Sequence, residues 1–178
     1  MKLYIVGSVA SGKSTLARRL SKTTGVPCHH LDEVVYTADP SEPWGDRKRP
    51  AEERDALFQK ILNSRDYVIE DAGRECFIEG MRQADTIILL DIPLHVRRKR
   101  ILLRWIRQNL GIEKCIYRPR PAVLKAMFQW AKNYDNGTDG TKKRVMPFCS
   151  KKVVLHNNKQ IKTYIRSVEE AWRNTIGR

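Results

Sequence analysis

The residues best suited to chemistry stand together near the beginning of the chain. Gly7, four variable residues, Gly12, Lys13 and Ser14 give the spacing G-x-x-x-x-G-K-S, between an apolar run and a stretch with helical periodicity. Glycines let backbone N–H groups approach phosphate oxygens closely, and a helix that starts near Lys13 directs its positive end at the same anion. We therefore predict a phosphate-binding loop, with Lys13 on the β- and γ-phosphates of a nucleotide and Ser14 on Mg²⁺. The residues expected to touch the nucleotide here are Gly7, Ser8, Val9, Ala10, Ser11, Gly12, Lys13, Ser14 and Thr15.

Acidic residues stand at the ends of two further predicted strands, 26–31 and 67–70. In open parallel sheets, ligands bind beyond the carboxyl ends of the strands, so these acids are expected beside the loop. Asp32 is a candidate for holding Mg²⁺ or for orienting a substrate hydroxyl, and the alternative is a carboxylate that caps the next helix. Asp71 is expected near Asp32 if the two strands are neighbours, with Arg74 reaching over the same cleft.

Arginines are concentrated in the segment that follows Pro93. They recur at spacings of three and four residues, which places them on one stripe of a helix that contains no acid. Such a stripe favours anion binding over a merely solvated face. Its members are Arg97, Arg100, Arg104 and Arg107. A second basic group, 47–49, precedes the helix expected after Pro50, and Arg47 is equally suited to holding a phosphate or to lying in a solvated loop.

Charge is distributed unevenly along the chain, whose net charge is +14. Residues 1–90 contain 13 Lys and Arg against 14 Asp and Glu, whereas residues 91–178 contain 21 against 6. The second half is therefore expected to face an anionic partner. A polyphosphate would be bound by a few converging arginines, whereas nucleic acid would be bound by a wider positively charged surface. The sequence leaves both partners open.

The cysteines and the hydropathy indicate a cytoplasmic protein that does not enter a membrane. Four cysteines lie far apart without a C-x-x-C pair, which favours free thiols over disulfides or a zinc site. No apolar run approaches the ~18–20 residues of a membrane span, and the first residues already read as strand and loop, without a signal peptide.

The elements that must position these residues alternate between strand and helix. Strands are expected at 3–6, 26–31, 67–70, 86–90 and 152–156, and helices after Lys13, Pro50 and Pro93, at 122–132 and at 159–172. Residues 134–148 are rich in Gly, Asn and Asp and are predicted to be a mobile loop. We therefore expect an α/β fold with a single domain over 1–178, a substrate-binding insertion at about 33–64 and a basic helical lid at about 94–150.

Several of these motifs together resemble the adenylate-kinase-like P-loop kinases, most closely the small branch labelled DNA topology modulation proteins. The features that carry the resemblance are residues 7–14, 31–32, 67–70 and 90–93, the pair Arg100 and Arg104, and segments 111–130 and 154–161. It implies a three-layer sandwich around a five-stranded parallel sheet in the order 2-3-1-4-5. It also implies that the turn after the last strand, with Asn157, Asn158 and Lys159, holds the adenine of ATP. The chain departs from adenylate kinases after the third strand, where Arg74 matches only loosely and Asp71 has no counterpart.

Two functions follow from these residues. The first is transfer of the ATP γ-phosphate to a small acceptor, such as a nucleoside monophosphate, with Lys13, Arg100 and Arg104 neutralising charge and Mg²⁺ held by Ser14 and Asp32. An alcohol acceptor would give its proton to Asp32 or Asp71, whereas a phosphate acceptor would be held by Arg47 and Arg74. The alternative is a nucleotide-dependent, DNA topology modulating protein that binds nucleic acid through its basic second half. Under either function, we expect a monomer or a dimer.

Overall fold

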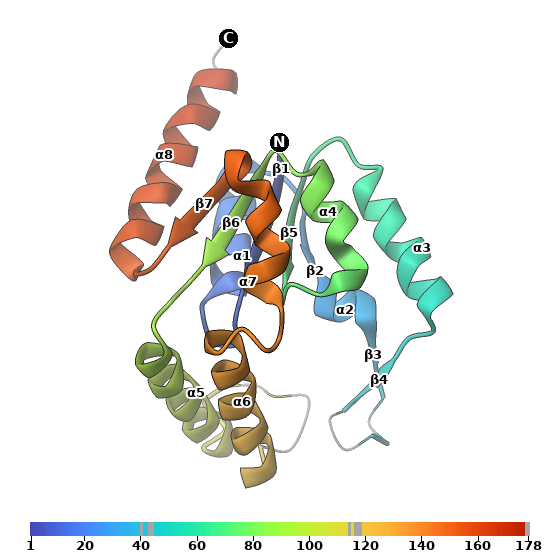
Figure 1. Ribbon diagram of the computed structural model, residues 1–178, viewed down its shortest axis with the longest axis vertical. Coiled ribbons are helices and arrows are strands. Elements are labelled where there is room, and N and C mark those ends of the chain that lie inside the picture. The colour runs from blue at the N-terminus through green and yellow to red at the C-terminus, as the bar shows by residue number, and fades with distance from the viewer. Residues whose placement is uncertain (40, 43–44, 114, 116–118, 177–178) are drawn as a thin grey trace.

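The computed structural model describes the whole chain apart from residues 40, 43–44, 114, 116–118 and 177–178. At its centre is a five-stranded parallel sheet in the order β2-β5-β1-β6-β7 (Figure 1). The strands are β1 (Lys2–Gly7), β2 (Cys28–His30), β5 (Tyr67–Asp71), β6 (Thr86–Leu90) and β7 (Lys152–Leu155). Counted without the separate two-stranded sheet β3–β4, this is the order 2-3-1-4-5, so the expected fold is confirmed.

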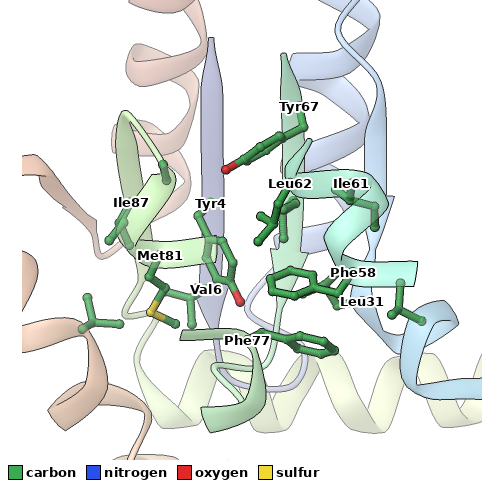
Figure 2. Close-up of a cluster of buried hydrophobic side chains, with 14 of the residues drawn as sticks. Tyr4, Val6, Leu31, Phe58, Ile61, Leu62, Tyr67, Phe77, Met81 and Ile87 are labelled. Carbon is green, nitrogen blue, oxygen red and sulfur yellow. The ribbon is translucent and has the colours of Figure 1, made fainter. Parts of the chain in front are cut away.

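Helices cover both faces of the sheet, because the side chains of each buried strand alternate between them. On one face, Leu3 and Ile5 of β1 pack against α1 (Lys13–Thr24) and α8 (Asn158–Ile176). On the other face, Tyr4 and Val6 pack in the cluster drawn in Figure 2. The elements on that second face include α2 (Leu31–Val35), α3 (Ala51–Leu62), the 3₁₀ turn η1 (Glu75–Phe77) and α4 (Ile78–Gln83).

The basic segment forms two helices at the carboxyl end of the sheet. Helices α5 (Leu94–Asn109) and α6 (Pro121–Asp135) pack together and lie below the strands in Figure 1. Their small core includes Ile101 and Met127, and Val9 and Ala10 of the glycine-rich loop pack against it. The expected lid region is therefore in direct contact with that loop, although four of its residues, 114 and 116–118, lie outside the described chain.

Two segments are more regular than the sequence indicated. The insertion contains α3, the helix expected after Pro50, and in addition α2 and an antiparallel hairpin of β3 (Tyr36–Ala38) with β4 (Asp46–Lys48), which the sequence did not indicate. The segment 134–148, expected to be a loop, contains α7 (Thr141–Val145) and leads into the 3₁₀ segment η2 (Met146–Lys151). Helix α7 forms because Val145 is buried in the core and the Thr141 hydroxyl donates to the carbonyl of Ala72 at 3.1 Å.

No helix in the described part of the chain is long and apolar enough to cross a membrane.

The contact between α7 and the turn after β5 depends on the absence of a side chain at Gly73. A Cβ atom there would lie 2.5 Å from Cγ2 of Thr141 and 3.0 Å from Cγ2 of Val6. Gly25 also has a left-handed backbone, with φ 72° against 88° at Gly73, but among the described residues no atom beyond its own chain neighbours lies within 4 Å of its Cβ position. We expect Gly73→Ala to lower the free energy of unfolding by ~1–3 kcal/mol more than Gly25→Ala. Urea denaturation of both variants measures this difference, and equal losses would contradict the packing described for α7.

Candidate functional site

The phosphate-binding loop leaves β1 at Gly7 and enters α1 through Gly12. A Cβ atom at Gly7 would lie 2.8 Å from the carbonyl oxygen of Leu90, so the close approach of β6 excludes a side chain there. Gly12 adopts φ 102° at the N-terminal cap of α1, a conformation that favours glycine. The two glycines of the motif therefore shape the loop and direct the start of α1 toward its concave side.

Several polar groups of this loop fit a polyphosphate. The Oγ atom of Ser11 is buried and has no hydrogen-bond partner in the structure. The Nζ atom of Lys13 donates to the carbonyl oxygen of Ser8 at 3.0 Å, a neutral acceptor that a phosphate oxygen can replace. Nη1 of Arg100 lies beside Gly12, 3.7 Å from the position that a Cβ atom would take there. A nucleotide phosphate would thus meet an ammonium, a guanidinium and a hydroxyl in addition to the backbone N–H groups.

Ser14 and Glu70 form the part of the site that could hold a metal ion. The Ser14 hydroxyl donates to Oε1 of Glu70 at 3.0 Å, and Nδ1 of His30 lies 2.9 Å from the same oxygen. Burial alone would raise the pKa of Glu70, but His30, Lys13 and Ser14 outweigh it and hold the pKa below its ordinary value. The hydrogen bonds with Cys28 and Glu70 raise the pKa of His30 to about 10. Glu70 is therefore an ionised carboxylate directly beside the hydroxyl expected to bind Mg²⁺.

This pairing differs from the metal site expected from the sequence, which combined Ser14 with Asp32. Asp32 lies in the first turn of α2 with 70% of its side chain exposed, and it forms an ion pair with Arg74. Among the described residues, no group of three or more His, Cys, Asp or Glu side chains is arranged to hold a metal ion. A magnesium ion at this site would be held by Ser14 and Glu70, together with phosphate oxygens and water, which is how Mg²⁺ is usually bound.

Asp71 is a buried anchor for the turn that follows β5. Its carboxylate accepts hydrogen bonds from the hydroxyl of Tyr4 at 3.2 Å, from the backbone N–H groups of Gly73 and Arg74 at 2.7 and 2.6 Å, and from Nη1 of Arg74 at 2.6 Å. Its side chain is fully buried. With these donors around it, Asp71 holds Arg74 in place, and its expected role as a proton acceptor stays a prediction.

Acidic side chains gather around Arg74, at a part of the site called the acidic rim below. Arg74 bridges Asp71 and Asp32 with one guanidinium. Burial and the nearby Asp32 carboxylate raise the pKa of Asp46, the first residue of β4. Arg47 extends from the same strand with 61% of its side chain exposed, and it pairs with Asp39 within the insertion, 3.6 Å away. The structure therefore brings Asp32, Asp71 and Arg74 together, whereas Arg47 pairs within its own hairpin.

The arginines of α5 have three different environments. Arg100 donates from Nη1 to the carbonyl oxygens of Ala10 and Ser11, at 3.2 and 2.9 Å, and from Nη2 to Oδ1 of Asn158 at 2.7 Å. Arg104 is half exposed and pairs with Glu113 at 3.0 Å. Arg97 is completely buried. The stripe read from the sequence is thus divided, and Arg100 is the member placed directly over the loop.

The turn expected to hold the adenine lies at the start of α8. Its backbone is fixed by two side chains: Asn157 Oδ1 accepts from the N–H of Gln160 at 2.9 Å, and Gln160 Oε1 accepts from the N–H of His156 at 2.6 Å. Asn158 is joined to the loop through Arg100. A groove of about 600 Å³ runs along α8 from Asn157 and Lys159 to Ser167. The adenine contacts of Asn157, Asn158 and Lys159 stay predictions.

The parallel sheet and the loop between β1 and α1 define the class of the protein: a P-loop fold with strand order 2-3-1-4-5. A family model described as "AAA domain" matches residues 3–113, more than half of the chain, and the chain therefore belongs to this family. The expectation of a P-loop protein is confirmed, and the narrower resemblance to DNA topology modulation proteins stays a prediction.

Comparison with individual proteins gives the same fold. A shikimate kinase of Aquifex aeolicus (strain VF5) is 30% identical over 105 residues, which cover 54% of this chain and 62% of the relative. The solved shikimate kinase from Acinetobacter baumannii in complex with shikimate has a TM-score of 0.60 at 14% identity, with 97% of this chain and 93% of that chain covered. The deoxyadenosine kinase from M. mycoides with bound dATP has a TM-score of 0.50 at 16% identity, with both chains covered completely.

Proposed function

We propose that the protein is a phosphotransferase that moves the γ-phosphate of ATP, bound with Mg²⁺, to a small acceptor. The observation that carries this proposal is the joining of the Arg100 guanidinium to both the phosphate-binding loop and the turn at Asn158. Kinases use this combination of a loop, a metal-side carboxylate and a cation to stabilise the charge of the transferred phosphoryl group. The likeness to a shikimate kinase and to a deoxyadenosine kinase supports the same class of reaction.

Each residue of the site has a defined task in this reaction. Lys13 exchanges its bond to the Ser8 carbonyl for the β- and γ-phosphate oxygens. Ser14, positioned by Glu70, offers its hydroxyl oxygen to the metal. Arg100 neutralises charge on the γ-phosphoryl group, and Arg104, one turn further along α5, joins it by leaving Glu113. Mg²⁺, when bound, draws electron density from the phosphate oxygens.

The acceptor side favours a hydroxyl compound over a nucleoside monophosphate. Arg74 already pairs with two carboxylates, and Asp46 adds a third nearby, so a second phosphate would enter an acidic rim. Asp32 is exposed and retains an oxygen that can accept the proton of an alcohol. We therefore place a small alcohol first among the acceptors, with Asp32 as its base and Arg74 as the group that orients Asp32.

A panel of acceptors tests this function. ADP production from ATP and Mg²⁺ is measured with sugars and other small alcohols, with nucleoside monophosphates, and with DNA or RNA added separately. Stimulation by an alcohol supports the proposal, and stimulation by a monophosphate alone would reverse the choice of acceptor. Turnover stimulated by nucleic acid alone would favour the alternative function in which the basic second half of the chain binds a phosphate backbone.

Glu70→Gln tests the metal side of the site. The change keeps the size of the side chain but removes the charge beside Ser14, so we expect the Mg²⁺ concentration for half-maximal ATP turnover to rise by ~10-fold or more. Glu33→Gln, on the exposed side of α2, is the matched control. A magnesium dependence that is the same in both variants and in the unchanged protein would remove Glu70 from the metal site.

A further inference from the structure

The side chain of Arg97 is a buried cation outside the set of residues assigned above. It projects from the first turn of α5 and has no exposed surface. Its Nε atom donates to the carbonyl oxygen of Ile92 at 2.8 Å, and its Nη2 atom forms an ion pair with Asp135 at the end of α6. A buried guanidinium is costly unless its charge is paired and its N–H groups are satisfied. Arg97 meets both conditions with partners from three separate segments.

One of those partners belongs to the phosphate-binding loop. Nη1 of Arg97 donates to Oγ of Ser8 at 2.7 Å, and to the carbonyl oxygen of Ala131 on α6 at 3.0 Å. The carbonyl oxygen of Ser8 in turn accepts a hydrogen bond from the Lys13 ammonium at 3.0 Å. Ser8 therefore lies between the cation expected to hold the nucleotide and the cation that is tied to α6.

The segment held by Arg97 also reaches the acceptor side. Two cations contact the ring of Tyr134 on α6, with Cζ of Arg97 5.0 Å and Nζ of Lys142 4.8 Å from its centroid. Beyond Lys142, Arg144 of α7 donates from Nε to the carbonyl oxygen of Gly73 at 2.7 Å. A continuous set of contacts thus runs from the phosphate-binding loop, through Arg97, α6 and α7, to the turn that carries Arg74.

We propose that Arg97 is a positioning residue that couples nucleotide binding at the loop to the packing of the α6–α7 segment. The inference rests on the nucleotide-binding half of the proposed function. Ser8 keeps its hydrogen bond only while Arg97, anchored by Asp135, keeps its orientation. Loosening α6 therefore weakens the loop, and a nucleotide that orders the loop also orders α6. Because coupling between two sites is reciprocal, the effect is measurable from either end.

The test removes the two ends of the contact separately. Ser8→Ala deletes the loop hydroxyl, and Asp135→Asn weakens the anchor on α6. Asp55→Asn, which alters an exposed pair with Arg54 on α3, is the matched control. Calorimetric titration with ADP and Mg²⁺ is expected to show ~5-fold or more weaker binding for Asp135→Asn. In the Ser8→Ala background, Asp135→Asn is expected to add little further loss, because both changes act through one guanidinium.

Hydrogen exchange distinguishes coupling from a purely structural role of Arg97, because a structural role alone would not make the exchange of α6 amides depend on ADP. In the unchanged protein, ADP is expected to slow exchange of the α6 amides, and in Ser8→Ala this slowing is lost while the rest of the fold stays protected. If Asp135→Asn binds ADP as tightly as Asp55→Asn does, the inference is overturned and Arg97 only stabilises the fold. Failure of the unchanged protein to bind ADP would instead overturn the proposed function, and this inference with it.

Discussion

Replacing Lys13 by alanine is expected to lower ATP turnover by ~10²–10³-fold, in line with the loss of one preorganised cation or donor from an active site. Lys13 is the first residue of α1, and its ammonium lies over the loop on the carbonyl of Ser8. A phosphate replaces that neutral partner with two charged oxygens, so the side chain acts mainly when the nucleotide is bound. Turnover is measured as ADP released at saturating Mg²⁺.

Lys22→Ala is the matched control, because Lys22 is an exposed lysine in the last turn of the same helix. It removes the same charge at the opposite end of α1 and is expected to leave turnover within about twofold, as surface changes usually do. Equal activity of the two variants would show that the G-x-x-x-x-G-K-S loop does not bind the phosphates that react.

Arg100→Ala is expected to lower kcat by ~10³-fold or more, the size of effect found for arginines that stabilise the transferred phosphoryl group. All three hydrogen-bond acceptors of Arg100 are neutral oxygens, so its charge is not neutralised by them. Arg100 is partly buried, and the resulting loss of hydration lowers its pKa. The charge is therefore available beside Gly12, where the phosphates are expected.

Arg107→Ala is the control for Arg100, since Arg107 is exposed two turns further along α5. Steady-state kinetics separate the two roles that Arg100 could have. A fall in kcat with a nearly constant KM for ATP indicates action on the transferred phosphoryl group. A raised KM with an unchanged kcat would restrict Arg100 to joining Asn158 and the loop, and would contradict its catalytic role.

The fold could be predicted largely from local pattern. The apolar runs at 3–6 and 86–90 are too hydrophobic for anything but central strands, and the motif between Gly7 and Ser14 requires a strand before it and a helix after it. Both are found in the structure. The same information places the acids of 67–71 at the carboxyl edge of the sheet, where the structure has them.

The identity of the acid beside Ser14 could not be predicted in this way. Glu70 and Asp71 are adjacent, and adjacent residues of a strand point to opposite faces of the sheet. Glu70 shares its face with α1 and meets Ser14, whereas Asp71 points to the face of Tyr4. Which face carries α1 is decided by the handedness of the β1–α1–β2 crossover, a property of the chain as a whole. A right-handed crossover, combined with the strand order, would have been the signal for Glu70.

The tertiary contacts of the basic segment could not be predicted from the sequence for a similar reason. Arg97 and Asp135 are 38 residues apart, and no periodicity connects them. The sequence shows a stripe of arginines without acids, but the acid that pairs with Arg97 comes from another helix. Likewise α7 is stabilised by contacts with Ala72 and Gly73 that lie far from it in sequence, so its Gly- and Asn-rich surroundings indicated only a loop.

The most direct test of the proposed phosphotransfer follows the γ-phosphate itself. ATP labelled on that phosphate is incubated with the protein, Mg²⁺ and the alcohol that stimulates ADP release, and the products are separated. The proposed function predicts that the label appears on the alcohol in the same amount as ADP, and that Lys13→Ala yields ~10²–10³-fold less of both. Label recovered as inorganic phosphate, with none on the acceptor, would contradict it and show an ATPase instead.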